Sequence, residues 1–247
     1  MHTNPRYDTI LEHLKRHKRA TIGELCQLVY VSEATVRRDL SDMQDLGLLR
    51  RVHGGAMYIE NTEEVAIAVR RSVNAADKEA TAALTLKHLP EFERVFVDNS
   101  STCLALVQRM DLRHKTVFTN SFRVAEALQQ MDQVTIIMPG GEIRKNADLV
   151  GSMACSALRN FRFDLMLSSC AAIDLGGTFE NSLSVRELKA AAMEQSERRI
   201  LLADRTKFQL SSPYRVAALQ DYDDIITNAP DDLLAPFRQA GVPIRNQ

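Results

Sequence analysis

From residue 78 onward, short apolar runs alternate with stretches of helical spacing, and this alternation restricts the chain to a small set of architectures. The apolar runs read "RVFVD", "KTVFTN", "QVTIIMPGG", "DLMLSSCAAID", "RRILLAD" and "YDDIITN". Helical stretches between them include residues 103–110, 122–131 and 185–196. Strands that alternate with helices predict an α/β fold, in which a largely parallel sheet has helices on both faces. No GxGxxG motif follows the first run, which disfavours a dinucleotide-binding fold.

The length of the chain leaves room for a second unit before this one. Its 247 residues, 45% of them hydrophobic, can bury a large core and divide most naturally into two domains. No apolar run approaches the roughly 18 residues of a membrane span, and residues 1–19 are charged and lack the apolar core of a signal peptide. We therefore expect a cytoplasmic protein that contacts no membrane.

The cysteines give no sign of a metal site. They stand far apart, form no CxxC pair and have no local histidine partner. The sequence therefore predicts buried free thiols and no metal or other cofactor. The four residues are Cys26, Cys103, Cys155 and Cys170.

The net charge of −1 conceals a small gradient along the chain. Residues 1–58 contain nine Lys and Arg against seven Asp and Glu, and the remainder contains 22 against 25, so the balances are +2 and −3. This difference permits an anion-binding surface near the start of the chain, although surface charge is usually only solvated.

The first segment shows three short helical patterns. Thr21 and Glu24 have the spacing of a capping box at the start of the second helix. Ser32 is a suitable N-cap for the third. The inward residues at helical spacing are Tyr7, Ile10, Leu11 and Leu14, then Ile22, Leu25, Cys26 and Val29, then Val36, Leu40 and Met43. The pattern predicts a helix, a turn and a helix after an initial helix.

The outward face of the third helix has the composition that a DNA major groove requires. Its side chains are short or basic, namely Ala34, Thr35, Arg38 and Ser41, with Arg37 on the flank. After it, "LLRRVHGGAMYI" places two apolar runs around a Gly-Gly pair, which predicts a two-stranded hairpin. This wing would place Arg50, Arg51 and His53 near the phosphates. Each arginine pair alone is typical of a solvated surface, but together the features favour DNA binding.

Two stretches carry a family resemblance. "VSEATVRRDL" followed by "GLLRRVHGGA" resembles the winged helix-turn-helix of the DeoR family of bacterial transcription regulators, usually repressors of sugar-utilisation genes. The resemblance covers most of residues 5–58. It implies that the third helix reads DNA, and that the contacting role falls to Ser32, Thr35, Arg37 and Arg38.

Small polar residues cluster where the predicted strands end. Ligands of parallel sheets bind outside the carboxyl ends of the strands, where side chains and helix-start amides can hold an anion. Each cluster alone is typical of a capped turn, but four on one edge favour a site for a polar small molecule. The clusters are residues 98–102 after the first strand, 119–121 after the second, Gly140 and Gly141 after the third, and Asp174 with Gly176 and Gly177 after the fourth.

This second half also resembles the DeoR family, through "VD.SST", "TNS", "GGEIR", "E.K" at Glu187 and Lys189, and "LLADRTKF". The resemblance implies a fold shared with ribose-5-phosphate isomerase and CoA transferases, and a phosphorylated sugar as effector. Ser100 departs from the glycine of many members. The effector-binding residues that it implies are Asp98, Ser100, Ser101, Thr102, Thr119, Asn120, Gly140, Gly141 and Lys189.

Enzymes share this fold, so an alternative is a sugar-phosphate isomerase or a CoA-transferase-like enzyme with an added DNA-binding head. Glu187 could then act as base or nucleophile and Lys189 as anion holder. A surface ion pair at the start of a helix explains the same two residues. Because a sensor gains nothing by consuming its signal, the DNA-binding segment favours a regulator over an enzyme.

We therefore expect a winged helix-turn-helix DNA-binding domain over residues 1–58, a linker over 59–77 with a helix around 65–71, and a sugar-phosphate effector-binding and oligomerisation domain over 78–247. The expected partners are double-stranded operator DNA, a phosphorylated sugar, and further copies of the chain in a dimer or tetramer. Oligomerisation follows because one small head touches few base pairs, and paired heads usually read symmetric half-sites.

Overall fold

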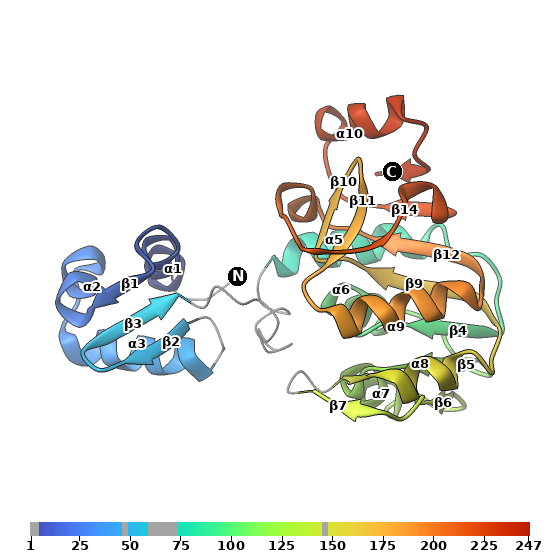
Figure 1. Cartoon of the computed structure of the whole chain (residues 1–247), viewed down its shortest axis with the longest axis horizontal. Coiled ribbons are helices and arrows are strands. Elements are labelled where there is room, and N and C mark those ends of the chain that lie inside the picture. Colours follow the sequence, from blue (N-terminus) through green and yellow to red (C-terminus); the bar gives the residue numbers. More distant parts are fainter. Residues whose placement is uncertain (1–4, 46–48, 59–73, 145–147) are drawn as a thin grey trace. The chain divides into compact units, whose positions relative to one another are not determined.

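The computed structural model of the chain describes residues 5–45, 49–58, 74–144 and 148–247 (Figure 1). The chain divides into two compact units, Met1–Ala75 and Ala76–Gln247. The last three residues of the expected linker belong to helix α5 (Ala75–Leu86). The expected helix around 65–71 lies outside the described residues.

The first unit is a winged helix-turn-helix. Its helices are α1 (Pro5–His17), α2 (Ile22–Val29) and α3 (Glu33–Asp45), and its strands are β1 (Arg19–Thr21), β2 (Leu49–Val52) and β3 (Gly55–Tyr58). The inward residues of α3, Val36, Leu40 and Met43, are buried as predicted. They pack with the apolar faces of α1 and α2 into one core.

The predicted two-stranded hairpin is confirmed as β2 and β3, and the structure adds a third strand, β1, that the sequence analysis did not predict. β1 pairs antiparallel with β3, and β3 pairs with β2. Three residues are too few for a strand to show its alternating pattern in the sequence. The pairing requires glycine at position 55, because a Cβ atom there would lie 2.1 Å from the carbonyl oxygen of Ala20.

The predicted helix boundaries agree with the local hydrogen bonds. The capping box at α2 is confirmed, because Glu24 N–H donates to Thr21 Oγ1 at 3.2 Å and Thr21 N–H donates to Glu24 Oε2 at 2.7 Å. Tyr30 ends α2 in the left-handed conformation, with φ 53°. Ser32 Oγ accepts from the Thr35 N–H at 3.4 Å at the start of α3. These contacts fix the turn between the two helices.

The second unit is built on a parallel sheet of seven strands in the order β15-β14-β12-β9-β4-β5-β6. Every neighbouring pair in it is parallel. Its strands are β4 (Arg94–Val97), β5 (Thr116–Thr119), β6 (Thr135–Ile137), β9 (Phe163–Ser169), β12 (Ser196–Leu202), β14 (Asp224–Ile226) and β15 (Ile244–Arg245). The parallel α/β sheet predicted from the alternation is confirmed.

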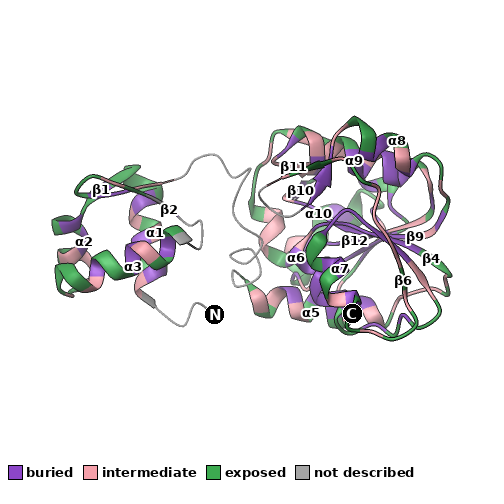
Figure 2. Cartoon of the chain, turned by 90° about the horizontal axis from the view of Figure 1, so that it is seen from below, coloured by how far each residue is buried: buried purple, intermediate pink, exposed green. Residues whose placement is uncertain are grey.

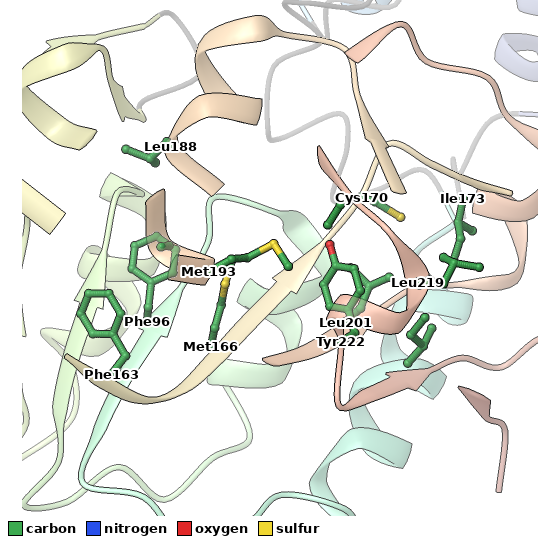
Figure 3. Close-up of a cluster of buried hydrophobic side chains, with 14 of the residues drawn as sticks. Phe96, Phe163, Met166, Cys170, Ile173, Leu188, Met193, Leu201, Leu219 and Tyr222 are labelled. Atoms are coloured by element: carbon green, nitrogen blue, oxygen red, sulfur yellow. The ribbon is translucent and has the colours of Figure 1, made fainter. Parts of the chain in front are cut away.

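Helices cover both faces of this sheet. One core joins the sheet to α8 (Ser152–Leu158), α9 (Leu183–Glu194) and α10 (Asp231–Gln239), and part of it is drawn in Figure 3. The other core joins the opposite face to α5, α6 (Ser101–Val107) and α7 (Phe122–Leu128). Buried residues therefore fill the strands themselves (Figure 2), which explains why their sequences read as continuous apolar runs.

Two smaller sheets lie outside the sequence prediction. β7 (Glu142–Ile143) pairs with β8 (Leu149–Val150), and β10 (Ala172–Asp174), β11 (Gly177–Glu180) and β13 (Tyr214–Ala217) form an antiparallel sheet. Two short 3-10 helices, Arg205–Gln209 and Leu219–Asp221, complete the unit.

The run "DLMLSSCAAID" is therefore two strands, and its prediction as one strand is wrong. β9 ends at Ser169, opposite the end of its neighbour β12 at Leu202. The chain then leaves the main sheet and enters β10. The turn with Gly176 and Gly177 belongs to the β10–β11 hairpin, so three of the four expected polar clusters follow strands of the main sheet directly.

Candidate DNA-binding surface and ligand site

The outward side of α3 presents the predicted basic residues to solvent. Arg37 and Arg38 are exposed, and Thr35 and Ser41 are half-buried. Arg37 forms an ion pair with Glu33 one turn earlier, at 3.3 Å. The face that the sequence predicted for DNA is thus accessible.

The wing contacts this helix through Arg51. Its guanidinium donates to Ser41 Oγ at 3.2 Å, and its backbone N–H donates to Gln44 Oε1 at 2.8 Å. His53 is exposed in the turn between β2 and β3. Arg50 lies in β2, and its side chain is outside the described part of the structure. The structure therefore joins two of the predicted DNA-binding residues, Arg51 and Ser41.

A second set of residues lies where the strands of the seven-stranded sheet end, which we call the carboxyl edge. Asp98 follows β4 there and is buried. Its Oδ1 accepts from the Ser100 N–H at 2.8 Å, and its Oδ2 accepts from the Ser169 N–H at 2.9 Å. Asp98 thus ties the end of β4 to the end of β9.

Lys189 of α9 is buried beside Asp98. Its Nζ lies 2.8 Å from Asp98 Oδ2 and 2.6 Å from Glu180 Oε1, and it donates to the Ser169 carbonyl oxygen at 2.6 Å. Burial alone would lower the pKa of Lys189, but the two carboxylates raise it. Burial would likewise raise the pKa of Asp98, but Lys189 and the hydrogen bonds to Ser100 and Ser169 lower it. Both groups are therefore charged at neutral pH.

Glu180 was not identified from the sequence. It is in β11, nine residues before Lys189, and no motif connects the two. Glu187, which the enzyme alternative required, is instead exposed on α9. The three donors of the Lys189 ammonium meet Asp98, Glu180 and a backbone carbonyl, so this cation holds the carboxyl edge together.

The loop after β4 leads into α6. Ser100 is the N-cap of this helix, and its Oγ accepts from the Cys103 N–H at 3.0 Å. A glycine at position 100 would lack this oxygen. Ser101 and Thr102 form the first turn of α6 and are buried.

The loop after β5 likewise leads into a helix that a serine caps. It consists of Thr119, Asn120 and Ser121. Thr119 Oγ1 accepts from the Ser121 N–H at 3.1 Å, and Ser121 Oγ accepts from the Val124 N–H at 3.3 Å to cap α7. The Asn120 amide nitrogen donates to the Leu149 carbonyl at 3.1 Å. Its Oδ1 is buried and accepts no hydrogen bond from the residues that the structure describes.

Residues 148–150 bring three of the predicted loops together. Asp148 accepts from the Asn99 amide after β4, and Leu149 contacts Asn120 after β5. Gly141, after β6, approaches Val150 so closely that a Cβ atom would lie 2.6 Å from the Val150 carbonyl oxygen. Gly140 and Gly141 both have positive φ angles, 73° and 113°.

Arg144 and Asp148 are further polar residues at this place. Arg144 Nε lies 3.4 Å from Asp148 Oδ1, and its guanidinium donates to Ser182 and, at 3.2 Å, to Ser184 at the start of α9. Asp148 is fully buried, and the Arg144 side chain is 20% exposed. Arg144 belongs to the "GGEIR" motif, whereas no sequence signal marked Asp148.

Two kinds of feature are absent from the described residues. None of their His, Cys, Asp and Glu side chains form a group of three or more that could hold a metal ion, and none of their helices is long and apolar enough to cross a membrane. Cys103, Cys155 and Cys170 are buried thiols, and Cys26 is half-buried.

A winged helix-turn-helix with exposed arginines, followed by an α/β unit with a polar carboxyl edge, defines a DNA-binding transcriptional regulator. Residues 6–62 match the family model described as "DeoR-like helix-turn-helix domain", and residues 73–229 match "DeoR C terminal sensor domain". The chain belongs to the DeoR family. It is a regulator of transcription and not an enzyme of sugar-phosphate metabolism.

Named relatives match over most of their length. The transcriptional repressor AccR of Agrobacterium fabrum is 33% identical over 232 residues, which are 92% of this chain and 90% of that protein. The L-fucose operon activator of Escherichia coli is 29% identical, over 90% of this chain and 94% of the relative. The glycerol-3-phosphate regulon repressor of Haemophilus influenzae is 28% identical, over 90% and 88%.

Solved structures resemble parts of the chain. A ribose 5-phosphate isomerase A from Methanocaldococcus jannaschii matches 55% of this chain and 55% of its own, with a TM-score of 0.39 and 10% identity.

Proposed function

We propose that this chain represses a carbohydrate-utilisation operon in the cytoplasm, as a dimer or tetramer, and that a phosphorylated sugar bound at the carboxyl edge controls its affinity for operator DNA. The proposal rests on two features that occur in the same chain. One is the exposed basic helix α3, which we call the reading helix, and the other is the buried polar carboxyl edge of the second unit. Among the relatives, AccR and the glycerol-3-phosphate regulon protein are named as repressors. The latter is named for a glycerol 3-phosphate regulon, and a third relative is named for an L-fucose operon.

The carboxyl edge has acceptors for sugar hydroxyls. Asp98 is ionised, because Lys189 and the backbone amides lower its pKa despite burial. Asn120 Oδ1 is buried, and no described residue donates to it. A buried acceptor without a donor destabilises the fold, and a ligand hydroxyl would satisfy it. The Asp98 carboxylate and Asn120 Oδ1 are the proposed contacts for the sugar.

The phosphate needs donors and a positive charge. In this proposal Ser101, Thr102 and neighbouring backbone amides supply donors, and Gly140 and Gly141 let the backbone approach the ligand. Thr119 holds the loop after β5 in place, because its Oγ1 accepts from the Ser121 N–H. Lys189 acts indirectly by holding Asp98 in place, because its ammonium is already hydrogen-bonded. Arg144 supplies the positive charge, since its guanidinium is partly exposed and joins Asp148 to the start of α9.

DNA contacts are proposed for the reading helix and the wing. Thr35, Arg37, Arg38 and Ser41 would face the groove together with Ser32, while Arg50, Arg51 and His53 would approach the phosphates. An arginine that bonds to a guanine edge contributes about 1 to 3 kcal/mol of discrimination.

The test of this role is Arg38→Ala, with the probe selected from random duplexes by the wild-type protein. The variant should weaken binding to this operator duplex by about 1 to 3 kcal/mol at constant salt and leave the melting temperature unchanged. Unchanged affinity in a folded variant would show that Arg38 does not read bases.

A further inference from the structure

Two acidic residues of the reading helix point toward α1. Asp39 is 4% exposed, and both of its carboxylate oxygens meet the Arg6 guanidinium, Oδ2 with Nε at 2.8 Å and Oδ1 with an η nitrogen at 3.0 Å. One residue further along α1, the Tyr7 hydroxyl lies 3.1 Å from Asp42 Oδ2. Asp39 directly follows Arg38, so this contact lies beside the proposed DNA face.

The geometry of the Arg6–Asp39 pair restricts how α3 can be oriented against α1. Two parallel hydrogen bonds between a planar guanidinium and a planar carboxylate fix direction as well as distance. The apolar stripe of α3, formed by Val36, Leu40 and Met43, selects the face that turns inward, but hydrophobic burial itself is non-directional. The final rotation of α3 about its axis therefore also depends on the polar contacts at its flanks.

On its opposite flank, α3 is held by polar contacts with the wing. Arg51 of the wing reaches Ser41 and Gln44 there. The reading helix is thus held between α1 on one side and the wing on the other. Of these contacts, the Arg6–Asp39 pair is the charged and more deeply buried one.

From this arrangement we propose that Arg6 is a positioning residue that sets operator specificity by fixing the rotation of α3 through Asp39. The inference rests on the proposed role of α3 in reading DNA, and it does not depend on the effector. A small rotation of α3 moves its outward side chains relative to the base edges. Contacts to base edges read the sequence and depend on that position, whereas phosphate contacts carry no sequence information.

Variants that keep or change the charge of this pair distinguish a loss of specificity from a general loss of DNA binding. Arg6→Lys keeps the net charge but replaces the planar fork by a point charge. Nonspecific affinity depends on charge, so it should stay unchanged. Asp39→Asn removes a negative charge near the DNA face, so nonspecific affinity should rise while specificity falls.

The experiment measures Kd for the selected operator duplex and for a scrambled duplex of the same composition, at two salt concentrations. For Arg6→Lys we expect the operator affinity to fall about tenfold, within the range that one mismatched base pair costs, with unchanged affinity for the scrambled duplex. Arg16→Lys is the matched control. It makes the same change in the same helix, in an exposed pair with Glu12, and should alter neither affinity.

The outcomes separate this inference from the proposed function. If Arg38→Ala weakens operator binding but Arg6→Lys does not, the positioning role is wrong. Equal losses for both duplexes in Arg6→Lys would show a merely structural role and would also overturn it. If Arg38→Ala has no effect either, the proposed base contact of Arg38 fails, and this inference loses the role of α3 on which it rests. An Asp39→Asn variant that binds both duplexes more tightly by the same factor contradicts it as well.

Discussion

Replacing Lys189 by methionine should destabilise the second unit strongly. The change removes the cation that Asp98 and Glu180 share and leaves a side chain of similar length. Water has little access to the remaining carboxylates, because the side chains of Asp98 and Glu180 are 2% and 13% exposed. The Ser169 carbonyl also loses the hydrogen bond from Lys189.

The size of the effect follows from this burial. Breaking a buried ion pair by removing one partner costs about 3 to 5 kcal/mol, a large part of the roughly 5 to 15 kcal/mol that stabilises a typical protein. For a domain of this size each kcal/mol lowers the melting temperature by about 2 to 4 °C, so we expect a decrease of roughly 6 to 20 °C.

The pH dependence of this loss has a defined sign. In the wild type the pKa of Asp98 is lowered on folding, so its contribution to stability is present above the unfolded pKa and is lost as the pH falls through the folded pKa. In the variant, burial without Lys189 should raise the pKa of Asp98 above its unfolded value. The variant then gains stability on protonation, and its deficit should shrink between pH 7 and pH 4.

Differential scanning calorimetry of the full chain measures both effects. The matched control is Lys115→Met, which removes an ion pair of the same 2.8 Å length with Glu93 at the surface. Solvent screens this pair, so its loss should hardly change the melting temperature. If Lys189→Met melts at the same temperature as Lys115→Met at pH 7, the argument from buried charge is wrong.

The remaining predictions concern binding. Arg51→Ala should weaken binding to the scrambled duplex as well as to the operator and lower the slope of log K against log salt by about one unit, as measured by fluorescence anisotropy. Unchanged affinity for the scrambled duplex, with an unchanged slope, would mean that Arg51 contacts no phosphate. Thr102→Val and Arg144→Gln should each abolish the response of operator binding to a phosphorylated sugar and leave affinity for DNA unchanged. Isothermal titration calorimetry that finds normal sugar-phosphate binding in either variant would remove that residue from the proposed site.

Local patterns predicted much of the fold. The apolar faces at helical spacing and the capping box at Thr21 located the helices of the first unit, because these signals need only neighbouring residues. Alternation of strand and helix predicted the parallel sheet, since parallel strands require crossover helices. The polar residues after β4, β5 and β6 then had to lie on one edge.

Contacts between distant segments could not be predicted in the same way. Lys189 meets Asp98 across 91 residues of sequence, and Asp148 meets Asn99 across 49. The sequence therefore suggested Glu187 as the acidic partner of Lys189, whereas the fold supplies Glu180 from a strand that no periodicity revealed. Strands of two or three residues, such as β1, β7 and β8, are likewise too short to show an alternating pattern.

The central claim is that a phosphorylated sugar controls DNA binding by this chain. The most direct measurement is the Kd for the selected operator duplex in the presence of a panel of pentose, hexose and glycerol phosphates, each compared with its unphosphorylated form. We predict that at least one phosphorylated compound changes the Kd by about fivefold or more, the lower end of typical coupling between sites, and that its unphosphorylated form does not. A Kd that no member of the panel changes, or that the unphosphorylated form changes equally, would contradict the claim.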